Sequence, residues 1–351
     1  MDAQNTCRWC RWLSVLSLFV FWCGQAIVSR VSHEAFDRGS RSANWPRAEM
    51  WRSVRPNRSL NKIDFVSQTE GWGISSKGEI VYTQDGGRTW VIKRSPQIYK
   101  LFGNFEARDE AQQVQFFSAV DGWALEGGHL IHTNDGGSSW HKVSFEDVII
   151  RSFYFFDQRT GWAVGERRVF DDEDKKWQGC LYATEDGGKS WKEVRLGVDL
   201  DYDWALFGVW ASSKKNVWVV GDLVLHSEDA GRTWRELKLG GEVYGVTTAV
   251  RFIDENHGWI TTNQGDRFYL TEDGGISRQV RMFPEIKGGI YALIQTGAST
   301  LWAVGQAGAY RSEDGGTGWA KILTGPFWTG QYLAKEGLLI FAGEQIVFGK
   351  L

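Results

Sequence analysis

Six short segments of this sequence carry an aspartate in the middle of a turn-like motif, Thr/Ser-x-Asp-Gly/Ala-Gly. The six carboxylates are those of Asp85, Asp135, Asp186, Asp229, Asp273 and Asp314. Carboxylates bind metal ions and act as general acids or bases, so a repeated aspartate is a candidate for either chemistry. A calcium loop, however, needs carboxylates at alternate positions, and these segments lack that spacing.

The residues around each aspartate favour a structural role instead. The glycines allow backbone angles that a side chain forbids, which is typical of a tight turn. A carboxylate there accepts hydrogen bonds from backbone amides, and the Thr or Ser two positions earlier can do the same. We therefore expect the aspartates to stabilise turns, and we expect no catalytic residue, no metal and no cofactor.

A Trp follows five residues after the aspartate in every segment but one, where Arg278 takes its place. The Trp ring is expected to pack over the turn and into the seam between sheets. Arg278 therefore predicts one of two outcomes: its unit packs less well than the others, or the Trp anchor has been replaced by a contact at the surface.

The spacing of the aspartates defines the elements that must position them. They recur every 41 to 51 residues, which is the length of one four-stranded propeller blade. A second Trp precedes each aspartate, usually by 11 to 14 residues: Trp72, Trp123, Trp162, Trp218, Trp259 and Trp302. In the third unit this distance is 24 residues, so a charged insertion at about 166–177 is predicted to protrude as a loop or hairpin.

Strands can be assigned within each unit and beyond the last aspartate. In the first unit we expect strands at 63–66, 71–75, 79–83 and 89–94, separated by Gly, Asp and Ser turns. Three further strands at 328–334, 338–342 and 345–348 and one at 51–54 would make a blade from both chain ends. The predicted fold is all-β: one seven-bladed propeller of four-stranded antiparallel blades, closed by the terminal strands. A six-bladed ring is the alternative.

The amino-acid composition agrees with a fold of many short strands and argues against some classes of partner. The 351 residues include 42 Gly, 20 Trp and 20 Phe but 3 Met. The formal net charge of −3 argues against a nucleic-acid partner, which would need a clearly basic domain. Outside the first 29 residues Cys180 is the single cysteine, so the ring cannot form an internal disulfide.

The N-terminus predicts export from the cytoplasm. Arg8 and Arg11 precede an apolar stretch, so residues 1–29 are predicted to be a signal peptide or an N-terminal membrane anchor. A lipoprotein, lipid-modified at Cys23, is a further alternative for this segment. Residues 30–48 are a polar linker and 49–351 the ring, which we expect outside the cytoplasm, in a periplasm or on the lumenal side of a thylakoid.

The repeated segments resemble the Asp-box (BNR) repeat family, which includes enzymes and non-enzymes. The fuller pattern, Gly161-Trp-Ala-Val-Gly165 or Leu301-Trp-Ala-Val-Gly305 followed by the Asp segment, resembles the photosystem II stability/assembly factor propellers. That resemblance implies a non-catalytic protein that assembles a membrane complex. The expected partner is a membrane protein or complex, of the photosystem II type if the resemblance extends so far, and the expected state is a monomer.

Binding on propellers uses the loops at the ring faces and the mouth of the channel. Aromatic and Arg side chains near the starts of the innermost strands are our candidates: Arg151, Trp204, Tyr244, Arg251, Tyr291 and Trp328. Packing between blades is the alternative role for each aromatic. Two other functions stay open at this point: a sialidase-like glycosidase, although no Arg-Ile-Pro strand occurs, and a module that binds a cell-surface polymer.

Overall fold

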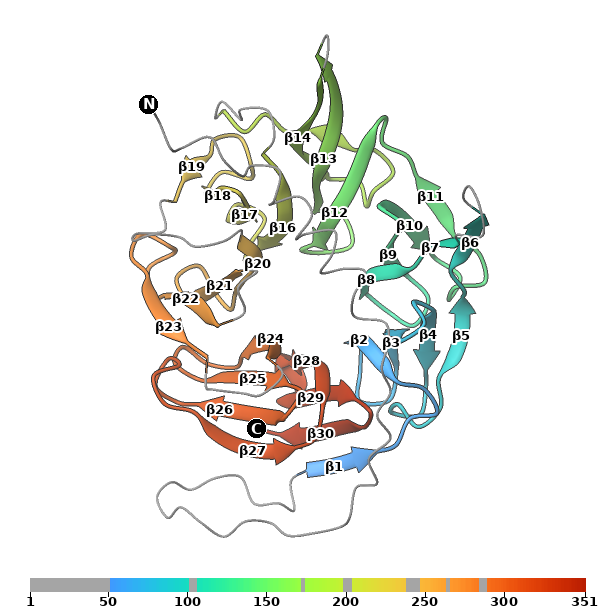
Figure 1. Ribbon diagram of the computed structural model, residues 1–351, viewed down its shortest axis with the longest axis vertical. Coiled ribbons are helices and arrows are strands. Elements are labelled where there is room, and N and C mark those ends of the chain that lie inside the picture. Colours follow the sequence, from blue (N-terminus) through green and yellow to red (C-terminus); the bar gives the residue numbers. More distant parts are fainter. Residues whose placement is uncertain are drawn as a thin grey trace, which may run out of the picture. The chain divides into compact units, whose positions relative to one another are not determined.

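The structure, a computed structural model, describes residues 51–100, 106–171, 174–197, 204–237, 247–262, 266–283 and 289–351. Seven four-stranded antiparallel sheets are arranged around one axis as a seven-bladed propeller (Figure 1). The predicted fold class is confirmed, and the six-bladed alternative is wrong. The leader and linker predicted for residues 1–48 lie outside the described residues. Within the described ranges, no helix has both the length and the apolar character needed to cross a membrane.

The first four blades follow one another along the chain, each from its innermost to its outermost strand. Blade 1 consists of β2 (Leu60–Phe65), β3 (Gly71–Ser75), β4 (Ile80–Thr83) and β5 (Val91–Arg94). Blade 2 consists of β8 (Ala111–Phe116), β9 (Gly122–Glu126), β10 (His129–Thr133) and β11 (His141–Val143). Blade 3 consists of β12 (Val148–Phe155), β13 (Gly161–Asp171), β14 (Asp174–Thr184) and β15 (Lys192–Glu193). Blade 4 consists of β16 (Leu206–Ala211), β17 (Val217–Gly221), β18 (Val224–Ser227) and β19 (Arg235–Glu236).

The last three blades complete the ring. Blade 5 consists of β20 (Thr247–Phe252), β21 (Gly258–Thr262), β22 (Arg267–Thr271) and β23 (Gln279–Met282). Blade 6 consists of β24 (Ile290–Gln295), β25 (Leu301–Gly305), β26 (Gly308–Ser312) and β27 (Ala320–Thr324). Blade 7 consists of β28 (Phe327–Leu333), β29 (Leu338–Gly343), β30 (Ile346–Lys350) and β1 (Trp51–Val54). A 3₁₀ turn at Ala334–Glu336 joins β28 to β29.

Blade 7 closes the ring by joining both ends of the described chain. Its outermost strand β1 pairs antiparallel with β30, from Trp51 opposite Gly349 to Val54 opposite Ile346. Closure of this kind holds the first and last segments in one sheet and leaves no blade edge open between them.

The hydrophobic core is divided among the seams between blades. Seven clusters of buried side chains each combine residues of two neighbouring blades. The Trp of the second strand reaches into the seam and stacks on the innermost strand of the next blade. Trp72 stacks on Phe116 with ring centroids 3.9 Å apart, and Trp218 stacks on Phe252 at 3.8 Å. Such pairs stabilise the ring beyond the area that they bury.

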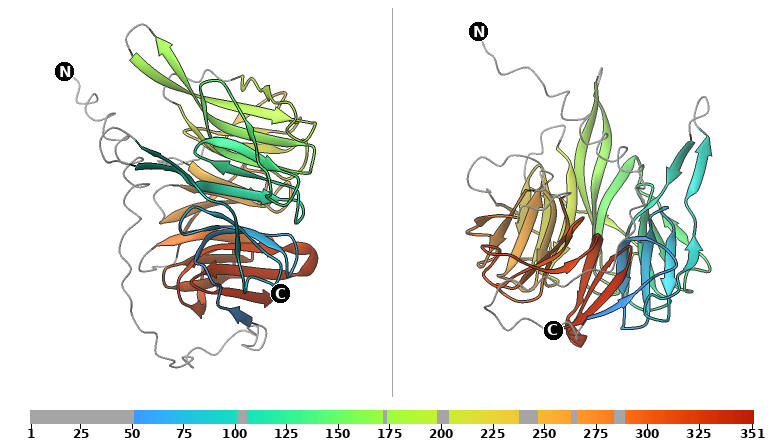
Figure 2. Two further views of the ribbon diagram at one scale, coloured as in Figure 1. Left: turned by 90° about the vertical axis from the view of Figure 1, so that its right-hand side faces the viewer. Right: turned by 60° about the horizontal axis from the view of Figure 1, so that its bottom comes forward.

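Two hairpins project from the ring on the side where the innermost strands begin (Figure 2). One is formed by β13 and β14, which have 11 residues each, whereas the second strands of the other blades have five or six. The other is formed by β6 (Gln97–Lys100) and β7 (Glu106–Asp109), between blades 1 and 2. On the longer hairpin the Arg168 guanidinium lies 5.3 Å from the ring centre of Trp177.

Candidate functional site

The repeated aspartates form closed hydrogen-bond networks within their own turns. Asp85 accepts bonds from the backbone amide of Thr89 at 3.0 Å and from its hydroxyl at 2.6 Å. The Thr83 hydroxyl donates to Asp85 and accepts from the amide of Gly87. The same amide and hydroxyl bonds reach Asp135, Asp186, Asp229 and Asp273, while Asp314 accepts from the amides of Thr317 and Gly318.

These bonds keep the carboxylates charged and occupied. The hydroxyl bond from Ser139 is the main cause that lowers the pKa of Asp135 to about 2, and bonds from Ser190 and Thr233 do the same for Asp186 and Asp229. Among the described residues no group of three or more His, Cys, Asp or Glu side chains is arranged to hold a metal ion.

The turn that lacks the Trp has kept the hydrogen bond that the Trp makes. In three other turns the indole Nε1 donates to the carbonyl of the second glycine, as from Trp90 to Gly87 at 3.0 Å. Arg278 donates from Nη1 to the carbonyl of Gly275, also at 3.0 Å. The guanidinium therefore replaces the donor of the indole but not its apolar surface.

The innermost strands share a backbone irregularity at one register position. In all seven blades the pairing of the innermost strand with its neighbour skips one residue near the start of the strand. The skipped residues are Asn61, Gln112, Arg151, Phe207, Thr248, Tyr291 and Trp328, which we call the bulge ring. A β-bulge leaves its extra residue out of the ladder and re-aims that side chain, and bulges are frequent beside binding sites.

The bulge ring surrounds one end of the central channel, which we call the bulge mouth. Four of its side chains are exposed and those of Phe207, Tyr291 and Trp328 are half-buried. The aspartate turns lie at the other end of the blades, because Thr83 pairs with Gly71 and Gly71 pairs with Phe65 at the end of β2. The two features therefore occupy opposite ends of the ring.

Charged and aromatic groups occupy different sectors of the bulge mouth. In blade 3, Arg151 binds the buried Glu166 through Nε at 3.0 Å. Arg94 of β5 holds the buried Glu126 through Nη2 at 2.6 Å and through Nε, which lies 2.9 Å from both carboxylate oxygens. On the far side, the rings of Tyr291 and Trp328 lie 5.4 Å apart in a tilted arrangement, and Tyr291 donates to Gln306 at 3.4 Å.

The six candidate binding residues predicted from the sequence lie in different parts of the structure. Arg151, Tyr291 and Trp328 belong to the bulge ring, and Tyr244 lies outside the described residues. Trp204 is half-buried and forms a parallel bridge with Gln178 near the base of the long hairpin. Arg251 lies further along its strand than the bulge residue Thr248, with its guanidinium over the ring of Trp210.

Sequence reasoning missed the other members of the bulge ring: Asn61, Gln112, Phe207 and Thr248. A positional signal for them exists. In blades 1 to 6 the bulge residue stands 11 positions before the Trp of the second strand. These residues have no common chemical type, so only their distance from the Trp of the second strand identifies them in the sequence.

Deeper in the channel, side chains of one innermost strand bond to the backbone of the next. Gln331 accepts from the amide of Phe65 at 2.7 Å and donates to Asp64 at 3.0 Å. Asp64 in turn accepts from the amide of Phe116 at 2.5 Å. Burial nevertheless raises the pKa of Asp64 to about 7. The inner wall is therefore joined from blade to blade by bonds of its own.

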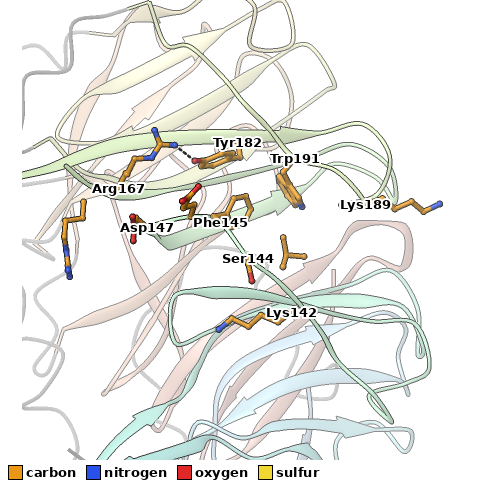
Figure 3. A pocket seen from close by; sticks show the side chains of 12 residues that line it. Lys142, Ser144, Phe145, Asp147, Arg167, Tyr182, Lys189 and Trp191 are labelled. Atoms are coloured by element: carbon orange, nitrogen blue, oxygen red, sulfur yellow. Dashed lines mark hydrogen bonds between the residues drawn. The ribbon is translucent and has the colours of Figure 1, made fainter. Parts of the chain in front are cut away.

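A separate cavity of about 840 Å³ lies on the outer side of blade 3 (Figure 3). Phe145, Tyr182 and Trp191 line it, with Lys142 and Lys189 at its sides. Two of its polar side chains are already paired, since Arg167 donates to the Tyr182 hydroxyl and also to Glu193.

Comparison with known proteins identifies the family. A family described as "Photosynthesis system II assembly factor YCF48" matches residues 43–152 and 146–290. The chain belongs to this YCF48 family. The rice "Photosystem II stability/assembly factor HCF136, chloroplastic" is 24% identical over 176 residues, 48% of this chain and 38% of that protein. A Synechococcus "Photosystem II assembly lipoprotein Ycf48" is 26% identical over 151 residues, 40% of this chain and 39% of that protein. The matches thus span about two fifths of these relatives.

Solved structures of the YCF48 family share the fold. "YCF48 bound to D1 peptide" superposes with a TM-score of 0.60 at 17% identity, over 88% of this chain and 99% of that one. YCF48 from Cyanidioschyzon merolae gives 0.60 at 18% identity, over 86% and 98%. An ancestral GH74 enzyme gives 0.61 at 14% identity, over 84% of this chain and 45% of the enzyme. At these identities the likeness shows the propeller fold, which assembly factors and glycoside hydrolases both use.

Proposed function

We propose that this chain is a non-catalytic assembly factor that acts outside the cytoplasm. It binds a segment of a membrane protein at the bulge mouth and thereby aids the assembly or stability of a membrane complex, with photosystem II as the first candidate. Membership of the YCF48 family supports this role, as does a relative solved with a D1 peptide. The observation that carries the site is the bulge repeated at one register in all seven innermost strands.

The bulge mouth has the features of a surface that recognises a polypeptide. Tyr291 and Trp328 form a half-buried aromatic patch, and aromatic residues are favoured anchors of protein interfaces. Arg151 is 40% exposed although it pairs with Glu166, so part of its guanidinium remains accessible. A bound segment would place an apolar side chain on the aromatic patch and a polar or acidic one near Arg151.

The carboxylates at the bulge mouth argue against hydrolysis of a glycoside. Such hydrolysis uses two carboxyl groups that both face the sugar. Glu126 and Glu166 are buried, and each is held by an arginine. Turnover of fluorogenic sialosides or of xyloglucan by the purified chain would overturn the non-catalytic part of the proposal.

The proposed location rests on the charged and apolar pattern of residues 1–29. Fractionation of cells that express a C-terminally tagged chain, combined with protease treatment of intact cells and spheroplasts, tests it. A tag that is recovered in the cytoplasm would contradict the proposal.

Binding is tested with the full chain and a synthetic D1 peptide, the ligand named for the relative, and then with detergent-solubilised membranes. Tyr291→Ala with Trp328→Ala should weaken binding about 30-fold, the loss expected for a hot spot of about 2 kcal/mol. Ile276→Ala is the matched control, because Ile276 is 69% exposed and lies in an aspartate turn at the other end of its blade.

Two results would count against the proposal in different ways. If the unaltered chain captures neither the peptide nor a membrane protein, the function is wrong. If it binds but the double variant binds equally well, the function stands and the bulge mouth is not the site.

A further inference from the structure

The outer rim of blade 5 carries a free sheet edge. β23 is the last strand of its sheet, and no described strand pairs with its outer side (Figure 1). The amide of Phe283 donates to the carbonyl of Asp266 at 2.9 Å, so Phe283 and every second residue before it bond to β22. The amides and carbonyls of Val280 and Met282 therefore point outward, to the free edge.

The side chains of these two residues are apolar and exposed. Val280 is 48% exposed and Met282 is 52% exposed. Because they alternate along the strand, they share one face of it with Tyr269, which pairs opposite Val280 and packs in the seam with blade 4. The outermost strand of blade 4, β19, has two residues and leaves this face uncovered. Apolar surface thus lies beside unpaired backbone.

The corresponding edges of three other blades are protected. The outermost strands of blades 3 and 4 have two residues each, both charged, and short charged edges resist pairing with another chain. In blade 1 the chain supplies its own partner just before β5. The Asn57 side chain accepts from the amide of Trp90 at 2.9 Å and donates to its carbonyl at 3.4 Å. Within the described residues, β23 has neither protection.

Two arginines at this edge are bonded to uncharged groups alone. Arg278 donates to the carbonyl of Gly275 at 3.0 Å, and Arg281 donates to the carbonyl of Gly315 in blade 6 at 3.1 Å. Arg281 also reaches a neighbouring side-chain amide oxygen and, at 3.4 Å, the outward carbonyl of Val280. No described carboxylate forms an ion pair with either guanidinium, so both positive charges favour an acidic partner.

We propose that the free edge of β23 binds an extended acidic segment of another polypeptide as a fifth strand of blade 5. An extended backbone has donors and acceptors at the spacing of those that Val280 and Met282 present. These two side chains lie on one face of the strand and Arg281 on the other, so the fitting segment alternates apolar and acidic residues. The edge lies on the rim, and the proposal does not depend on the function proposed for the bulge mouth.

A synthetic peptide tests the chemistry of the partner. An eight-residue peptide that alternates valine and glutamate, blocked at both ends and labelled with a fluorophore, is titrated with the full chain. We expect saturable binding that weakens as salt is added. Lysine in place of glutamate should weaken binding about tenfold or more.

N-methylation of the peptide tests strand addition itself. Alternate amides of a strand face the same edge, so one peptide is methylated on its valine amides and another on its glutamate amides. The two patterns should differ in affinity about tenfold or more, because one of them removes the donors that face β23.

The amide of Met282 reports directly on the edge. The chain has 3 Met residues, so labelling with ¹⁵N-methionine gives few signals, and Met282→Leu identifies the one that matters. Exchange of this amide with solvent should be fast in the free chain and should slow about tenfold or more when the acidic peptide saturates it.

Variants place the site on blade 5. Val280→Pro removes an outward amide hydrogen, which the fold does not use, and should weaken peptide binding about tenfold or more. Ile92→Pro is the matched control, because Ile92 follows Trp90 by two positions in blade 1 as Val280 follows Arg278. It should bind the peptide as the unaltered chain does. Arg278→Gln with Arg281→Gln keeps side-chain donors but should weaken binding and remove its salt dependence.

The proposal is overturned if the acidic peptide does not bind, if the lysine peptide or both methylated peptides bind equally well, or if exchange at Met282 stays unchanged. Equal binding by Val280→Pro and Ile92→Pro also overturns it. So does a dimer, seen by light scattering, that Val280→Pro dissociates, because the edge would then bind a second copy of this chain. The Tyr291→Ala and Trp328→Ala double variant should bind the acidic peptide normally, which keeps this test separate from that of the bulge mouth.

Discussion

Gly136 and Gly188, which follow repeated aspartates as the first and the second residue of their turns, should differ in how well they tolerate a side chain. Gly136 in blade 2 and Gly188 in blade 3 both have positive φ angles, 68° and 77°. A Cβ at Gly136 would meet nothing closer than 3.6 Å, whereas a Cβ at Gly188 would lie 2.3 Å from the ring of Trp123. Blade 4 already has an alanine at the first of these positions, Ala230, with φ of 65°.

These contacts give different expected losses. An alanine in the left-handed region costs about 1 kcal/mol, so Gly136→Ala should lose about that much. Gly188→Ala adds a steric clash, because Trp123 stacks on Phe155 at 5.0 Å and on His132 at 4.5 Å and has no room to retreat. Overpacking of this kind costs about 1–3 kcal/mol more, for a total of about 2–4 kcal/mol.

Urea unfolding followed by circular dichroism measures both losses. Each variant should shift the midpoint without changing the slope, since the surface exposed on unfolding is the same. Ala230→Gly should stabilise the chain slightly, by up to about 1 kcal/mol, because it removes the same backbone strain. Equal losses for Gly136→Ala and Gly188→Ala, or a destabilising Ala230→Gly, would refute the reasoning.

Two further predictions concern single side chains. Arg278→Ala should lower the free energy of unfolding by about 1 kcal/mol, the net value of its bond to the Gly275 carbonyl. Trp319→Ala, at the equivalent position, should lower it more because apolar packing is lost as well as the bond to Gly316. The urea midpoints of the two variants test this order. Asp64 should make stability depend on pH: its pKa is about 7 when folded and near the ordinary 3.8 when unfolded, so its contribution is fully present below about pH 4 and is lost as the pH rises to about 7. The free energy of unfolding should therefore fall across that range by at most about 4 kcal/mol relative to Asp64→Asn, and a pH-independent difference between the two proteins would contradict it.

Much of the fold follows from local signals in the sequence. The Asp-Gly-Gly turns and the preceding Trp residues recur at the length of one blade, and each signal depends on a few neighbouring residues. The seventh blade has no Asp turn. Its three C-terminal strands and the strand at 51–54 can still be predicted, because each is a short apolar segment bounded by turn residues. Closure then follows because a ring leaves no open edge.

The candidate site is harder to predict because a backbone irregularity defines it. Asn61, Gln112 and Thr248 are ordinary polar residues whose side chains give no indication of a bulge. The role of Arg278 also depends on the three-dimensional arrangement of its turn, in which the guanidinium donates to the Gly275 carbonyl.

The two ends of each blade differ in whether their polar groups already have hydrogen-bond partners. This difference indicates which end stabilises the fold and which end can bind a partner. At the aspartate turns the carboxylates are bound by neighbouring amides and hydroxyls, so a partner could bind them only by breaking bonds that hold the turn. At the bulge mouth the ladder is interrupted in every blade, and side chains there are exposed or half-buried. A ligand can contact those groups without disrupting the seams, because no residue of the bulge ring belongs to the buried clusters that form the seams. The bulge mouth is therefore the end of this ring where partner recognition conflicts least with folding.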